Sequence, residues 1–229
     1  MFSRILKHLV LSLFCCAPQV HAALVDDAFN EGMADYPEFI FCTRSKYKDG
    51  HWYANIAHFC DDVNDKAYHG SGNPDKSVLY KYNIKTKRKT IIYDAKGGTI
   101  RDPHVDYYGK SIIFSYRING SDYFNLYQIQ SDGSGMCRIT NGPWDDIEPC
   151  RLPDGDIMFV STRCKRWVSC MLTQVATLYR CKPDGSGITA VSANVEHDNT
   201  PAVLPDGRIL FTRWEYVDRS QVKFHHLWT

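Results

Sequence analysis

Short apolar runs separated by turns make up most of the sequence between residues 78 and 229. In the run 157–162, Ile157, Phe159 and Ser161 alternate with Met158, Val160 and Thr162. Both faces of the strand therefore carry apolar side chains, as in a strand that is buried on both sides of its sheet. Asp154 and Gly155 precede this run, and glycine tolerates the positive φ that a tight hairpin turn needs. The pattern predicts an all-β fold of short strands joined by turns.

The same pattern recurs at a regular spacing. Pro103, Pro149 and Pro201 each stand six residues before a glycine, and an apolar strand ending in arginine follows. A third strand follows at Leu126-Tyr127, Leu178-Tyr179 and Leu227-Trp228, and Asp-Gly-Ser-Gly turns lie at 132–135 and 184–187. The proline-to-proline steps of 46 and 52 residues are in the range typical of propellers and solenoids. The repeat therefore predicts a β-propeller of four-stranded blades.

The strands group into about three and a half blades. Segments 39–44, 78–84 and 90–93 form a first blade without its innermost strand, and two whole blades follow at about 100–140 and 146–192. A last blade begins at residue 200 and reaches its third strand at Thr229. Residues 23–38 are expected to be a lead-in segment, and about 45–77 an insertion into the partial propeller of 39–229. We expect an incomplete ring that is part of a longer propeller protein; the alternative is a self-closed four-bladed ring, which would leave bare strand edges.

Residues 1–22 have the layout of a secretory signal peptide. Arg4 and Lys7 precede the apolar run 9–16, and Val20-His21-Ala22 offers a small-residue cleavage site. The apolar run is too short to cross a bilayer, and no later stretch is apolar for long enough to do so. We therefore expect a periplasmic or secreted protein without a transmembrane segment after cleavage.

The net charge argues against one class of partner, and the cysteine content predicts disulfides. The formal net charge of +1 and the lack of a basic cluster give no support for a nucleic-acid partner. Seven cysteines remain after residue 22, and some are expected to pair in an oxidising compartment. Cys164 and Cys170 flank a short insertion and are the candidates for a loop-closing disulfide.

The repeat unit resembles that of TolB-type β-propellers. Longer phrases are similar to the secreted bacterial family that carries the middle, propeller domain of the hydrazine synthase alpha subunit. They include His-Trp-Tyr-Ala-Asn at 51–55, Arg-Asp-Pro-His-Val at 101–105, and the segments 152–166, 194–201 and 211–218. The resemblance covers most of 36–229 and implies a six-bladed ring, of which this chain would be a part. It does not extend to hydrazine chemistry, which needs c-type haems, because the sequence lacks a C-x-x-C-H attachment motif.

Polar residues gather just ahead of each innermost strand, where they are expected to converge on one rim of the central channel. The candidate ligand-binding set is Arg101, Asp102, His104, Asp146, Glu148, His197 and Asp198, with Asp145 and Glu196 beside it. Three functions fit such a rim. The carboxylates and imidazoles could hold a divalent cation; Asp102 and Glu148 could be the acid/base pair of a propeller glycosidase; or the rim could bind a protein or peptide.

The structural alternative is that these side chains cap turns and join neighbouring blades. The arginines that end the second strands, Arg44, Arg117, Arg163 and Arg213, are expected to bridge to a carboxylate or carbonyl of a neighbouring blade. The sequence contains no nucleophile elbow, phosphate loop or H-E-x-x-H pattern. We therefore favour a binding or scaffold module without catalysis of its own and with no required cofactor. A hydrolase or a metal-binding enzyme subunit is the alternative.

Overall fold

The computed structural model describes residues 27, 35–44, 77–118, 123–170, 173–216 and 225–229. The expected signal peptide, most of the lead-in and the insertion up to residue 76 lie outside this part of the chain. The chain divides into two compact units, 1–39 with 82–88 and 40–81 with 89–229. All residues of the candidate site belong to the second unit.

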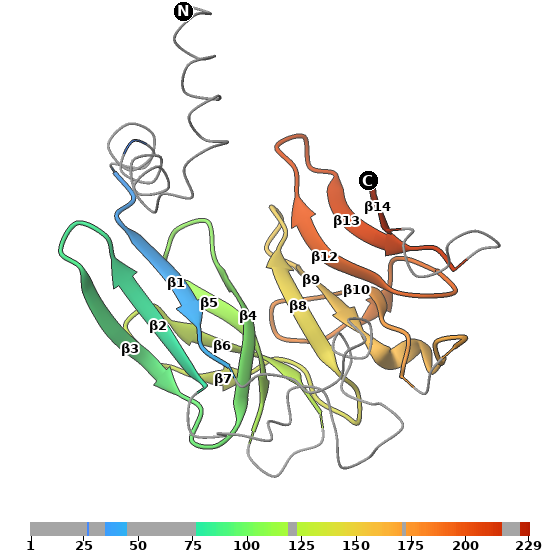
Figure 1. Ribbon diagram of the computed structural model, residues 1–229, viewed down its shortest axis with the longest axis horizontal. Helices are drawn as coiled ribbons and strands as arrows, with labels where there is room; N and C mark the ends of the chain where they lie inside the picture. Colours follow the sequence, from blue (N-terminus) through green and yellow to red (C-terminus); the bar gives the residue numbers. More distant parts are fainter. Residues whose placement is uncertain (1–26, 28–34, 45–76, 119–122, 171–172, 217–224) are drawn as a thin grey trace, which may run out of the picture. The chain divides into compact units, whose positions relative to one another are not determined.

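The described residues form four antiparallel sheets, which confirms the predicted all-β fold (Figure 1). Blade 1 has the order β1-β2-β3 and blade 2 the order β4-β5-β6-β7. Blade 3 is β8-β9-β10-β11, and blade 4 is β12-β13-β14. The bounds are β1 Glu38–Cys42, β2 Val78–Asn83, β3 Arg88–Asp94, β4 Thr99–Val105, β5 Ser111–Arg117, β6 Asn125–Gln130, β7 Cys137–Arg138, β8 Asp146–Arg151, β9 Ile157–Ser161, β10 Thr177–Cys181, β11 Thr189–Ala190, β12 Asp198–Val203, β13 Ile209–Trp214 and β14 His225–Trp228.

Hydrophobic side chains of successive blades pack against each other. Ile113 and Leu126 of blade 2 share a cluster with Ile157, Phe159 and Tyr179 of blade 3. A second cluster joins blades 1 and 2, and a third combines blade 3 with partly buried side chains of blade 4. Burial from both sides explains why β5 and β9 are buried along their whole lengths, as the apolar runs predicted.

The Asp-Gly-Ser-Gly turns are close-packed against the preceding blade. Gly133 has a φ of 90°, and a Cβ there would lie 2.8 Å from the carbonyl oxygen of Ile92. Gly185 occupies the equivalent place in blade 3, where a Cβ would meet the Ile139 carbonyl. Glycine is therefore required for two reasons, the positive φ and the lack of space.

The innermost strands of blades 2, 3 and 4 are neighbours. Strand β8 packs against β4 on one side and β12 on the other. In each blade the first strand pairs with the second in antiparallel register and leads to it through an Asp-Gly or Tyr-Gly turn. The candidate residues therefore lie on adjacent strands.

Candidate functional site

The residue before each repeated proline has a left-handed backbone. Its φ is 54° at Asp102, 52° at Glu148 and 56° at Thr200. The strand register shifts at the same point in β4, β8 and β12, so each of these residues lies in a β-bulge. Residues other than glycine rarely adopt this conformation unless their surroundings hold them in it. The three prolines thus mark one equivalent backbone site, as their spacing predicted.

Side chains at this site connect each blade to the next. Oδ2 of Asp102 accepts a hydrogen bond from the backbone N–H of Glu148, at 3.2 Å. Oε2 of Glu148 in turn accepts one from the backbone N–H of Thr200, at 2.5 Å. We call Asp102, Glu148 and Thr200 the inter-blade relay.

Arg101 lies between the two carboxylates of the relay. Its Nε is 2.5 Å from Asp102 Oδ2, its Nη2 is 3.2 Å from Glu148 Oε1, and the residue is only 3% exposed. The guanidinium also lies over the Phe124 ring, 5.8 Å from its centroid. Burial and the Asp102 charge raise the pKa of Glu148, and Arg101 opposes that rise. The arrangement is a buried ionic cluster with hydrogen bonds in place on both Glu148 oxygens.

Asp146 and Asp198 are fully buried at the first position of their strands, and each binds an arginine. Arg163 Nη2 is 2.7 Å from Asp146 Oδ2, and Ser161 Oγ donates to Oδ1. Arg213 binds both oxygens of Asp198, at 2.8 and 2.9 Å. Burial raises the pKa of Asp146, against the opposing effect of Arg163.

Arg163 and Arg213 do not form the expected ion pairs with a neighbouring blade, although each also donates to a backbone carbonyl in the segment that leads in from the preceding blade, Asn141 at 3.3 Å and Ala193 at 3.4 Å. Arg163 and Arg213 bind carboxylates of their own blades, because the end of the second strand lies beside the start of the first in an antiparallel hairpin. In blade 2, Ile100 occupies the position of Asp146 and Asp198, and Arg117 instead lies over the Phe124 ring at 4.8 Å. The ion pairs of Arg163 and Arg213 thus lie within their own hairpins.

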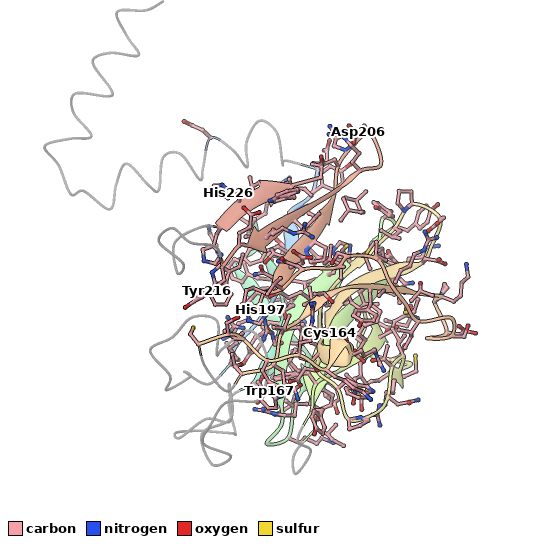
Figure 2. All side chains as sticks on the ribbon, turned by 90° about the vertical axis from the view of Figure 1, so that its right-hand side faces the viewer. Cys164, Trp167, His197, Asp206, Tyr216 and His226 are labelled. Carbon is pink, nitrogen blue, oxygen red and sulfur yellow. The ribbon has the colours of Figure 1, made fainter. Side chains whose placement is uncertain are left out.

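The two histidines of the predicted set serve different surroundings. His197 is fully buried, and its Nδ1 accepts a hydrogen bond from the Ala176 backbone at 3.0 Å. Its ring centroid is 5.7 Å from that of Trp214, and Figure 2 labels His197. Burial and Arg151 lower the pKa of His104, which Asp106 partly counteracts. His197 is therefore a packing residue that joins blades 3 and 4. His104 lies next to the last residue of β4, at the end of the strand that leads into the turn.

Thr200 is the member of the relay that sequence reasoning missed. The available signal for Thr200 was its position directly before Pro201, which matches Asp102 before Pro103 and Glu148 before Pro149. Asp145, which was noted in the sequence, has a linking role of its own. Its Oδ1 accepts from the backbone N–H of Phe124 at 2.9 Å and so joins blades 2 and 3.

The structure does not show the predicted bridge between Cys164 and Cys170, which are both free thiols. Cys164 ends the 3-10 turn Thr162–Cys164, and Cys170 lies in a turn beyond the bridge between Trp167 and Gln174. The Cys164 thiol instead donates to the Val175 carbonyl, 3.2 Å away.

The described part of the site does not fit a metal ion. Within those ranges, no three His, Cys, Asp or Glu side chains come together as ligands. Between Asp102 and Glu148 the Arg101 guanidinium supplies the positive charge that a cation would bring. In the same described segments, no helix has the length and apolar character that crossing a membrane requires.

Comparison of the fold with solved structures finds propellers. Hydrazine synthase of Kuenenia stuttgartiensis matches with a TM-score of 0.65 and 16% identity over 83% of this chain. The chain spans 29% of the length of that protein. TolB of Acinetobacter baumannii has a TM-score of 0.47 at 20% identity and covers 60% of this chain and 32% of its own. A putative TolB of Agrobacterium tumefaciens has 0.48 at 22%, covering 60% and 46%.

The likeness to hydrazine synthase confirms the β-propeller fold and agrees with the resemblance seen in the sequence. At 16% identity it shows the fold and does not transfer an activity. No protein-family model matches the chain, and no curated protein does.

Proposed function

We propose that this chain is an extracytoplasmic β-propeller module that binds a partner protein or scaffolds an assembly, without catalysis of its own. One observation carries the proposal. The acidic side chains before the innermost strands are engaged in links within and between blades, through the relay and through the Asp146–Arg163 and Asp198–Arg213 pairs. Groups committed to holding the fold together are poor candidates for acid/base work on a substrate.

The expected signal peptide at 1–22 supports the extracytoplasmic location. N-terminal sequencing of the mature protein from the host envelope tests it. A chain that begins at Ala23 agrees with the proposal, and retention of Met1 in the cytoplasm contradicts it.

The competing hydrolase function is tested with purified full chain on a panel of oligosaccharides, with and without added Ca²⁺, Mg²⁺ or Mn²⁺. The proposal expects no turnover and no stabilisation by the ions, and a lower melting temperature for Asp102→Ala. It fails if the wild type hydrolyses a glycan and a folded Asp102→Ala does not.

A further inference from the structure

A groove of about 480 Å³ lies between blades 2 and 3, at the end of the strands remote from the relay. The turn after β4 and the turn after β8 form two of its walls, and Pro183 of blade 3 adds a third. Figure 2 labels Asp206 in the corresponding turn of blade 4, well away from His197 at the start of β12. The groove therefore lies apart from Asp102, Glu148 and His197, although His104 of the predicted set is near enough to Arg151 for the arginine to lower its pKa.

The floor of the groove holds a half-buried arginine. Arg151 Nη1 donates to the Gly155 carbonyl at 3.2 Å, and Nη2 donates to Oε1 of Gln128. Across the described ranges no carboxylate forms an ion pair with Arg151. A guanidinium carries five N–H donors, so donors remain beyond these two hydrogen bonds. Burial lowers the pKa of Arg151, the direction expected for a cation that has lost water.

The Asp106 carboxylate, whose charge partly counteracts the effect of burial on the pKa of Arg151, is committed to its own turn. The Asp106 carboxylate accepts from the backbone N–H groups of Tyr108, Lys110 and Ser111 and from the Ser111 hydroxyl, at 2.7 to 3.0 Å. Its four hydrogen bonds fix the loop that carries the groove wall. The exposed Lys110 side chain adds a second positive charge at the edge. The groove thus presents cationic groups to a ligand.

Two exposed tyrosines lie beside the half-buried Arg151. Tyr107 is 60% exposed, and its hydroxyl donates to the Arg151 carbonyl at 3.0 Å, which fixes the ring against the groove. Tyr108 is 85% exposed. Leu152, Pro153 and Pro183 supply apolar walls. Tyrosine and arginine gathered around a desolvated position are the residue types that dominate binding energy at protein interfaces.

We propose that this groove binds an acidic segment of a partner protein. A carboxylate of the segment pairs with the Arg151 guanidinium, and an apolar side chain next to it packs against Tyr108 and Pro153. The positive charge selects the carboxylate by complementarity. The leucine and proline walls suit an aliphatic side chain better than the hydroxyl-covered surface of a sugar acid. This inference rests on the proposed function as a binding module and names its class of partner.

The test is phage display of random octapeptides on the full wild-type chain, followed by affinity measurements on synthetic winners. The expected winners share Asp or Glu next to an apolar residue. Their affinity falls at least about tenfold with Arg151→Gln and with Tyr108→Ala. Tyr108→Ala keeps the test valid if Arg151→Gln unfolds, because the Tyr108 side chain is almost fully exposed. Arg208→Ala, which removes a surface arginine from the turn of blade 4, is the matched control and retains binding.

Three results overturn the inference: no acidic consensus, winners that bind both groove variants as tightly as the wild type, or variant-sensitive binding of an acidic oligosaccharide only. Failure of the proposed function has a different signature. It appears as turnover of an oligosaccharide by the wild type, whatever the groove variants do to peptide binding.

Discussion

Oδ2 of Asp102 accepts a hydrogen bond from the backbone N–H of Glu148 at 3.2 Å, although 46 residues separate the two in the chain. Glu148 makes the same kind of contact with Thr200, 52 residues further on. Each contact joins the bulge of one innermost strand to the bulge of the next. A β-bulge that leaves its own ladder incomplete thus obtains a hydrogen-bond acceptor from the preceding blade.

Removing the carboxylate of Glu148 is expected to destabilise the fold strongly. Glu148→Ala leaves the Thr200 N–H without its acceptor and removes one carboxylate from buried Arg101, which should lower the free energy of unfolding by about 2–4 kcal/mol. Urea denaturation followed by circular dichroism measures the change. Glu148→Gln, which keeps an oxygen acceptor, should lose less. Equal stability of Glu148→Ala and the wild type would show that the contact contributes nothing.

The buried pair Asp198–Arg213 is expected to be energetically coupled, unlike the exposed pair Asp206–Arg208. Asp198 is fully buried and Arg213 binds both of its oxygens, so a double-mutant cycle with alanine should give a coupling energy of about 1–3 kcal/mol. The same cycle on Asp206 and Arg208, whose side chains are 53% and 60% exposed, should give no measurable coupling. Similar values for the two pairs would contradict the assignment of Asp198 to the hairpin.

Thr200 is expected to be a strained position. A β-branched residue at a φ of 56° is costly, whereas asparagine tolerates this region better. Thr200→Asn should therefore raise the free energy of unfolding by about 0.5–1 kcal/mol, measured by thermal melting. At position 102, asparagine has the same backbone preference as aspartate, but its amide oxygen is a weaker hydrogen-bond acceptor than a carboxylate. Asp102→Asn should therefore not raise the free energy of unfolding. A destabilising Thr200→Asn would mean that the threonine side chain has a role beyond the backbone.

The fold could be predicted from the sequence because the repeat contains proline and glycine residues, each of which suits only particular backbone conformations. Pro149, Gly155 and Gly185 each meet a local requirement, and such requirements recur with the blade. The partners of charged side chains could not be predicted in the same way. Whether Arg163 binds its own blade or the next depends on the strand register, which no local pattern specifies.

For a related reason, only some residues of the candidate site could be identified from the sequence. Asp102 and Glu148 stood out as acidic residues at equivalent positions, but Thr200 did not, because its contribution to the relay is its backbone N–H. His197 was grouped with them by its place in the sequence. Its fully buried ring, however, serves a hydrogen bond to the Ala176 backbone.

The turn held by Asp106 is expected to make stability depend on pH in the acid range. Burial raises the pKa of Asp106, but the four hydrogen bonds to its carboxylate outweigh that effect, so the pKa lies below its ordinary value of 3.8. A depressed pKa in the folded state means a contribution that is complete above pH 3.8 and is lost as the pH falls through the folded value. Asp106→Asn should therefore lower the melting temperature by roughly 2–5 °C at pH 7 and by much less at pH 2.5. A difference between the two proteins that does not change with pH would contradict this role.

The link between blades is tested most directly by hydrogen exchange at the backbone amide of Glu148, measured by NMR in the wild type and in Asp102→Ala. The amide of Leu204, which donates to the Arg208 carbonyl within blade 4, serves as the internal control. A structural relay requires that the substitution reduce protection of the Glu148 amide by about tenfold or more relative to that of Leu204. If protection of the Glu148 amide is unchanged in a folded Asp102→Ala protein, the carboxylate does not join the blades, and a role in binding or catalysis at this position has to be considered again.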